Sequence, residues 1–105
     1  MTEPVRELRI YHVLPGRLAA LVARFRDATL PLFARHGIAV EGPWQGADGA
    51  TVVYLLRFAS DEDRDARLAA FRADPDWQRA LAASEADGPL TDRIETLPLS
   101  PLSRR

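Results

Sequence analysis

The stretch RELRIYHVLPGRLAALVARF, residues 6–25, changes its hydrophobic period at Pro15-Gly16 from that of a strand to that of a helix. Alternation over residues 5–13 predicts a β-strand, in which neighbouring side chains point to opposite faces. One face carries Leu8, Ile10 and His12, and the other carries Glu7, Arg9, Tyr11 and Val13. The stretch therefore predicts a strand that turns directly into a covering helix.

A helix is predicted from Leu18 to about His36. Its apolar positions follow the helical spacing and are Leu18, Leu21, Val22, Phe25, Ala28, Thr29, Leu32 and Phe33. The charged residues largely outside this stripe are Arg17, Arg24, Asp27 and Arg35. Because the ring of Pro31 clashes with the carbonyl four residues earlier, we expect a kink or a one-turn break near residues 27–30. Gly37 is suited to end the helix.

The rest of the chain contains three further strands and two helical segments. First come a strand over 38–44 with a bulge at Gly42-Pro43, a turn over 45–49 and a strand over 51–58. A helix from Ser60 through Phe71 and a short helix from Asp74 to about Gly88 follow. The chain ends with a strand over 90–97 and an extended tail over 98–105. Ser60 and Asp63 resemble a capping box. Asp74-Pro75-Asp76 combines an N-cap residue with a proline at the first helical position.

The predicted element order, β-α-β-β-α-β, is that of a ferredoxin-like α+β fold with a four-stranded antiparallel sheet and both helices on one face. A chain of 105 residues suits one domain, which we assign to residues 1–105 with a core over about 5–97. The run VVYLL in the strand over 51–58 is apolar at both parities, which indicates a sheet covered on both faces. We therefore expect a homodimer, a dimeric α+β barrel whose two sheets enclose a space.

Composition argues against several classes of function. Apolar residues make up 47% and charged residues 28% of the chain, as in ordinary globular proteins. The 14 basic residues, all arginine as is typical of a GC-rich bacterial genome, are balanced by 15 acidic ones, so no basic stripe is available for nucleic acid. There is no cysteine for disulfide or thiolate chemistry. Neither a leader peptide nor an apolar run of about 20 residues is present, so we expect a cytoplasmic protein with no membrane partner.

Several motifs together resemble those of the NIPSNAP family. They are, in chain order, Glu7-Leu8-Arg9-x-Tyr11, Pro15-Gly16-Arg17, Pro31-x-Phe33-x-Arg35-His36-Gly37, Gly42-x-Trp44, Val53-Tyr54-Leu55 and Asp74-Pro75-Asp76-Trp77. The resemblance covers about residues 7–97 and implies a dimeric α+β barrel. Similar barrels include cofactor-independent monooxygenases of quinols and polyketides, haem-degrading monooxygenases, and small isomerases or lyases. The family has no accepted catalytic signature, so the resemblance implies no residue roles.

Three polar residues of the first strand, Arg9, Tyr11 and His12, are candidate catalytic residues. If Leu8 and Ile10 face the helices, Arg9 and Tyr11 face the dimer side, where a guanidinium and a phenol could bind a carboxylate, enol or phenolate. His12 then points to the helices or to the sheet rim, although an imidazole suits a general base near neutral pH. The structural alternative is an ion pair of Arg9 with an acid such as Glu7 or Glu95, a Tyr11 ring packed at the dimer seam and a packed or rim His12.

Further candidates for substrate binding are Trp44, Tyr54, Arg57 and Glu95. Trp44 would line the barrel mouth, while Arg57 and Glu95 would share the face of Arg9. Two histidines in unrelated places, without a spaced set of carboxylates, give no metal site, and no cofactor is expected. Haem binding is a further possibility, and it would need His12 or His36 as the iron ligand.

Two functions remain open from the sequence. The leading hypothesis is a small enzyme acting on an apolar, oxygen-bearing substrate of phenol, enol or polyketide type, as a cofactor-independent monooxygenase or as an isomerase, cyclase or lyase. Arg9 would stabilise the anion, and Tyr11 or His12 would handle the proton. The alternative is a non-enzymatic ligand-binding or scaffold dimer. A hollow with converging polar groups favours the enzyme, whereas a filled barrel with Arg9 tied to an internal acid favours the scaffold.

Overall fold

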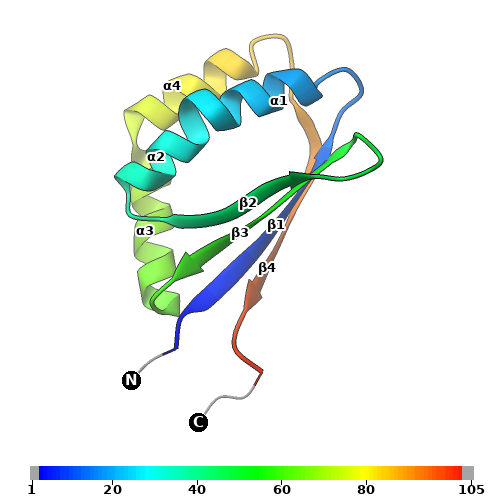
Figure 1. Cartoon of the computed structure of the whole chain (residues 1–105). Coiled ribbons are helices and arrows are strands. Elements are labelled where there is room, and N and C mark those ends of the chain that lie inside the picture. The colour runs from blue at the N-terminus through cyan, green and yellow to red at the C-terminus, as the bar shows by residue number, and fades with distance from the viewer. Residues whose placement is uncertain (1–2, 103–105) are drawn as a thin grey trace.

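A computed structural model describes residues 3–102 of the chain. Its elements are β1 (Val5–Val13), α1 (Leu18–Arg24), η1 (Phe25–Thr29), α2 (Leu30–Arg35), β2 (Ala39–Gln45), β3 (Thr51–Phe58), α3 (Asp61–Ala73), α4 (Pro75–Ser84) and β4 (Thr91–Leu99). The strands form one antiparallel sheet in the order β2-β3-β1-β4, and the helices lie on one side of it (Figure 1). The predicted ferredoxin-like α+β fold is confirmed. No helix within residues 3–102 has the length and hydropathy needed to cross a bilayer.

The first helix is irregular next to Pro31, as predicted, but it widens instead of breaking. The five residues Phe25–Thr29 form the π-helical turn η1 between α1 and α2. A wider turn suits this place, because Pro31 has no N–H to donate and its ring crowds the carbonyl four residues earlier. Such turns often occur at functional sites. The helix ends before Gly37, whose positive φ of 70° is the left-handed conformation that favours glycine.

The two faces of the sheet are the reverse of the sequence prediction. Alternation in β1 is as expected, but the side chains buried beneath the helices are Val5, Glu7, Tyr11 and Val13. The buried residues of β3 on the same face are Val52, Tyr54, Leu56 and Phe58, and Tyr54 is the partner of Arg9. Arg9 and Tyr11 therefore face the helices. Leu8, Ile10 and His12 lie on the opposite side, which we call the open face.

Aromatic rings explain why this face of β1 is the covered one. The ring of Tyr11 packs 5.4 Å from that of Phe25 and 5.5 Å from that of Tyr54. Phe25 in turn lies 5.3 Å from Tyr54, edge to face. Phe33 extends the cluster to Phe71, at a ring distance of 4.7 Å. Such large rings bury more apolar area than the aliphatic side chains of Leu8 and Ile10 would, so the helices pack over the rings.

The second half of the chain follows its predicted start signals. The Ser60 hydroxyl accepts a hydrogen bond from the Asp63 N–H at 3.0 Å, and the Asp63 carboxylate accepts one from the Ala59 N–H at 3.0 Å. The register of β2 against β3 shifts between Glu41 and Trp44, as the predicted bulge requires. Strand β4 extends to Leu99, two residues beyond its predicted end, so the tail is shorter than expected. Its last residues, 103–105, lie outside the described part of the chain.

Asp74 joins the end of α2 to the start of α4. Its carboxylate accepts hydrogen bonds from His36 Nε2 at 2.7 Å and from Arg35 at 3.1 Å. It also caps α4 by accepting the Asp76 N–H at 2.9 Å. His36 thus lies at the end of the helix, as predicted, and its ring is also hydrogen-bonded to an acid from a distant segment of the chain.

The Asp74 carboxylate should make stability depend on pH. The hydrogen bond from His36, followed by those from the Asp76 N–H and Arg35, lowers the pKa of Asp74 from 3.8 to about 2. Since the unfolded chain binds this proton more readily, the contribution to stability is complete above about pH 4 and is lost as the pH falls through about 2. Thermal melts of wild type and Asp74→Asn should therefore differ most at pH 6 and converge toward pH 2. Asp65→Asn, which changes a side chain that is 75% exposed, is the control; an Asp74→Asn difference constant with pH would contradict the account.

Candidate functional site

A cavity of about 210 Å³ lies between the sheet and the helices. Its polar lining residues are Arg9, Tyr11, Arg24, Thr29, Arg72, Glu85 and Thr91. Its apolar lining residues are Phe33, Leu68, Phe71, Trp77, Leu81 and Ile94. They come from every layer of the fold, with β1 and β4 below and the helices above. The sequence predicted a hollow between the sheets of two chains. This cavity lies instead on the helical side of the sheet, within one chain.

Arg9 forms an ion pair with Glu7 of its own strand, which is the structural alternative that the sequence offered for it. Its Nε donates to Glu7 Oε2 at 2.7 Å, and the Arg9 and Glu7 side chains are only 12% and 8% exposed. Arg64 approaches the other carboxylate oxygen at 3.9 Å. Burial lowers the pKa of Arg9, but its interactions with Tyr54, Glu7 and Tyr11 outweigh that effect, and the net shift is upward. Arg9 is therefore a permanently charged group in the cavity wall.

Two tyrosine hydroxyls meet beside Arg9. The Tyr11 and Tyr54 oxygens are 2.8 Å apart, and Tyr54, which pairs with Arg9 across the β1–β3 ladder, is fully buried. Burial, with the neighbouring Tyr11, raises the pKa of Tyr54 well above its usual value, although Arg9 opposes the shift. Tyr54 thus keeps its proton at neutral pH and can donate it to the Tyr11 oxygen. In that arrangement the hydroxyl proton of Tyr11 is free to donate into the cavity.

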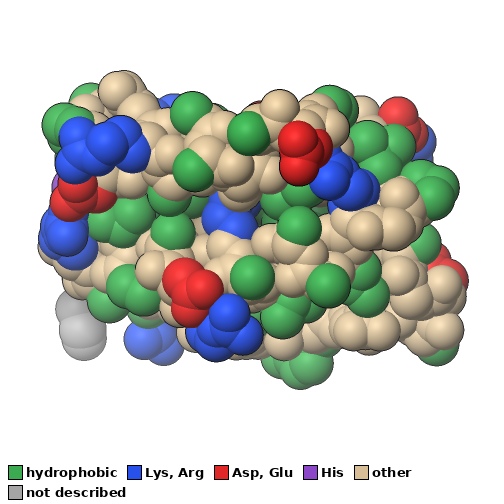
Figure 2. Space-filling model, turned by 90° about the horizontal axis from the view of Figure 1, so that it is seen from above, with side chains coloured by type: hydrophobic (Ala, Val, Ile, Leu, Met, Phe, Trp, Pro, Cys, Tyr) green, Lys and Arg blue, Asp and Glu red, His purple; other side chains and the backbone are tan. Residues whose placement is uncertain are grey.

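Arg24 forms part of the roof of the cavity and was missed by the sequence analysis. It was placed outside the apolar stripe, but it is 7% exposed because α4 packs over it. Its Nη1 donates to Ser84 Oγ at 3.1 Å and approaches Glu85 Oε2 at 3.5 Å, and its guanidinium lies 5.6 Å from the centre of the Trp77 ring. Figure 2 looks down on the helical layer, which is hollowed along its middle.

The other predicted site residues lie away from the cavity. His12 was expected at the helices or the rim, but it lies on the open face, where its Nε2 forms a hydrogen bond with Glu95. Arg57 is also exposed on that face. Trp44 is 55% exposed and lies beside Val22 in a shallow hollow at the β2 end of the sheet. The structure thus brings together Arg9, Tyr11 and Tyr54 and separates them from the remaining candidates.

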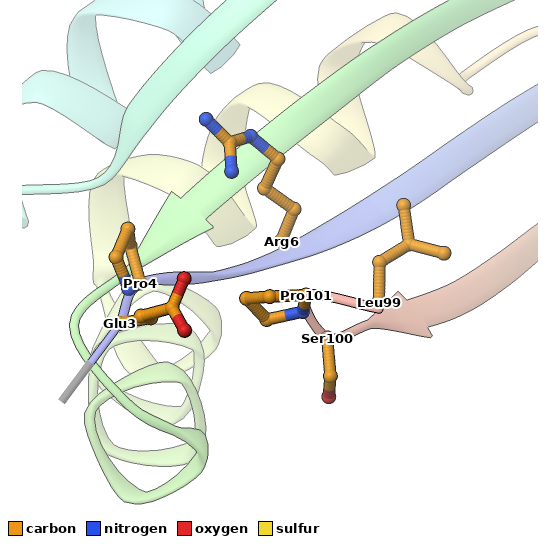
Figure 3. Close-up of a pocket in the computed structure, with 6 residues that line it drawn as sticks. All are labelled: Glu3, Pro4, Arg6, Leu99, Ser100 and Pro101. Atoms are coloured by element: carbon orange, nitrogen blue, oxygen red, sulfur yellow. The ribbon is translucent and has the colours of Figure 1, made fainter. Parts of the chain in front are cut away.

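Two larger hollows are lined by fewer polar and charged side chains. A groove of about 440 Å³ lies between the start of β1 and the end of β4, with Arg6 and Glu3 as its charged groups (Figure 3). Arg6 is already paired with Glu41 at 3.5 Å. A hollow of about 600 Å³ near Pro15-Gly16 carries apolar side chains and glycines. Within residues 3–102, no three histidines or acids gather as metal ligands would. Polar groups converge most in the cavity beneath the helices, which is therefore the candidate site.

Comparison with known proteins agrees with this fold. The sequence model of the NIPSNAP family matches residues 6–104. The chain belongs to the NIPSNAP family. No curated protein matches this NIPSNAP chain.

Solved structures share the fold of this NIPSNAP protein at low sequence identity. An uncharacterized NIPSNAP domain protein from Burkholderia xenovorans is 22% identical, with a TM-score of 0.80 over 94% of this chain and 95% of that chain. A NIPSNAP family protein with unknown function from Agrobacterium tumefaciens is 24% identical, with a TM-score of 0.82 over 95% and 89%. A candidate antibiotic biosynthesis monooxygenase from Nitrosomonas europaea is 14% identical, with a TM-score of 0.70 over 97% and 93%. These similarities concern the fold alone.

Proposed function

We propose that this protein is an enzyme for small, planar, oxygen-bearing molecules such as phenols and enols, which bind between the sheet and the helices. The observation that carries the proposal is the meeting of Arg9, Tyr11 and Tyr54 at one buried corner beside the cavity. A hydrogen-bond donor next to a fixed positive charge, in a site that excludes water, stabilises an oxygen anion. The volume of about 210 Å³ holds roughly seven waters at ~30 Å³ each and suits one or two fused rings.

Two reaction types would use these groups in the same way. In an isomerisation or cyclisation, Arg9 and Tyr11 hold the oxygen of an enolate while a proton moves between carbon atoms. In a cofactor-independent oxygenation, the bound anion reacts with dioxygen as co-reactant. With a quinol, one oxygen atom enters the ring to give a hydroxyquinone and the other leaves as water. Glu85, the one carboxylate among the described lining residues, would accept the substrate proton. The fold shared with the monooxygenase candidate supports the oxygenation.

A second copy of the chain would cover the open face. Its apolar residues include Leu8, Ile10, Val53, Leu55, Leu97 and Leu99. Leu97 is 55% exposed in the single chain, and none of the helices within residues 3–102 covers this side of the sheet (Figure 1). An apolar sheet face of this kind is usually an interface, because exposing it to water would favour aggregation. In this arrangement each subunit keeps its own cavity, and the two cavities lie on the outer sides of the paired sheets.

Binding of 2-naphthol and oxygen uptake with 1,4-dihydroxynaphthalene test the proposed function. Wild type should bind 2-naphthol and should speed the conversion of the quinol to 2-hydroxy-1,4-naphthoquinone and water. Tyr11→Phe should weaken 2-naphthol binding about two- to tenfold, as expected when one hydrogen bond to the ligand oxygen is lost. His12→Gln, on the opposite side of the sheet, is the control and should bind like wild type. Weaker binding in His12→Gln with unchanged binding in Tyr11→Phe would contradict this site.

A further inference from the structure

The guanidinium of Arg24 is buried without a full set of hydrogen-bond partners. Among the described residues its Nε is the one buried side-chain nitrogen or oxygen that has no partner. The Arg24 side chain is only 6% exposed. A buried charged donor left unpaired is unfavourable, and such groups in native proteins commonly have a functional reason. Since Arg24 lines the cavity, a bound molecule can supply the missing acceptor.

Positive charge exceeds negative charge around the cavity, and the one acid beside Arg24 is held at a long distance. The described lining residues include three arginines, Arg9, Arg24 and Arg72, but only one carboxylate, that of Glu85. Glu7 is already engaged by Arg9 at 2.7 Å. Glu85 stands 3.5 Å from Nη1 of Arg24, longer than the roughly 2.7–2.9 Å of a strong charged hydrogen bond. The Glu85 carboxylate contacts Arg24 at Nη1, so the side of the guanidinium that carries the Nε–H is left to another acid.

The surroundings of Arg24 favour a flat ligand. The Trp77 ring lies 5.6 Å from the guanidinium carbon and 4.6 Å from the Phe71 ring, so aromatic faces line this end of the cavity. Arg24 comes from α1 in the helical roof, whereas Arg9 and Tyr11 come from β1 in the sheet below. A planar molecule in the cavity would therefore meet polar anchors at two separate places.

We propose that Arg24 binds a carboxylate of the substrate through its Nε and Nη2, and hence that the substrates are planar hydroxy acids rather than neutral phenols. A guanidinium offers two parallel N–H groups that match the two oxygens of a carboxylate. The hydroxyl or enol oxygen of the same molecule lies at Tyr11 and Arg9. This inference rests on the proposed function and names its substrate class.

A matched pair of ligands tests the carboxylate subsite. 6-Hydroxy-2-naphthoate carries a carboxylate and a hydroxyl on different rings, and 2-naphthol has the same hydroxyl without the acid. Wild type should bind the acid at least about tenfold more tightly than 2-naphthol, as one charged hydrogen-bond pair would give. Arg24→Gln should abolish this preference, and Arg24→Lys, which keeps the charge without the planar fork, should retain only part of it. Arg26→Gln, which changes a side chain that is 69% exposed and paired with Asp27, is the control and should keep it whole.

The NMR signal of the Arg24 Nε–H group gives a second, direct readout. This signal is identified by its loss in Arg24→Lys, and circular dichroism confirms that both Arg24 variants are folded. Addition of 6-hydroxy-2-naphthoate or of benzoate, which has no hydroxyl, should shift it, whereas 2-naphthol should leave it nearly unchanged.

The outcomes separate this inference from the proposed function. Equal binding of both naphthalene ligands with sensitivity to Tyr11→Phe would overturn the subsite and leave the proposed function standing. A benzoate shift at Arg24 without any binding of 2-naphthol would support the subsite and overturn the phenol site. A preference for the acid that Arg26→Gln removes as well as Arg24→Gln would also overturn the subsite, because the attraction would then be a general effect of positive charge.

Discussion

Replacing Glu7 by alanine should lower the free energy of unfolding by about 3–5 kcal/mol, the usual cost of leaving one member of a buried ion pair without its partner. Arg9 would remain in the wall of the cavity, 12% exposed, with no acid at hydrogen-bond distance among the described residues. For a domain of this size the melting temperature should fall by at least ~12 °C. Thermal and urea unfolding of wild type and Glu7→Ala measure the change.

Two controls show whether the loss comes from the unpaired charge. The double variant Glu7→Leu with Arg9→Met removes both charges and keeps most of the volume, so it should recover most of the lost stability. Asp27→Ala breaks the exposed pair of Arg26 and Asp27 and should hardly change the melting temperature. If Glu7→Ala were no less stable than Asp27→Ala, the Arg9–Glu7 pair would not have the structural role assigned to it.

Replacing Ile10 by aspartate should convert the proposed dimer into a monomer. Ile10 lies in the middle of the open face, paired with Val53 on β3 and with Glu95 on β4. A carboxylate there would have to lose its hydration inside an apolar interface, which costs several kcal/mol. Light scattering should give wild type twice the chain mass of 11.7 kDa and Ile10→Asp one chain mass.

The control for this substitution lies on the helical side of the protein. Ala66→Asp adds the same charge to an exposed position of α3 and should keep the mass of wild type. A wild-type protein with the mass of one chain, or an Ile10→Asp variant that stays a dimer, would refute the proposed interface. The cavity beneath the helices would not be affected by either result, because it is formed within one subunit.

The fold could be predicted from the sequence, because each element carries its own local signal. Alternation identified β1, and Ser60 and Asp74 identified the starts of two helices. Alternation separates the two faces of a strand but does not say which one the helices cover. The covered face is determined by contacts between distant segments. Arg9 lies beside Tyr54 of β3, and the ring of Tyr11 packs against the ring of Phe25 in the helical layer. Judged by polarity alone, Arg9 and Tyr11 were assigned to the wrong side.

The roof of the site shows a second limit of sequence patterns. Arg24 follows Leu21 by three residues, a spacing that places it at the border of the apolar stripe, so a weak signal was available. Its burial depends on α4, which places Trp77 and Ser84 against it. Glu85 lies in the turn after α4, where no periodicity indicates direction. Such residues are identified only when the helices are packed together.

A crystal structure of the protein grown with 2-naphthol tests most directly the claim that the site lies between the sheet and the helices of each subunit. The account predicts one ligand molecule in each cavity, its hydroxyl oxygen within hydrogen-bond distance of the Tyr11 oxygen and its rings against Phe33 and Phe71. A ligand bound instead on the open face against Leu8 and Ile10, or a cavity left without ligand at a saturating concentration, would contradict it.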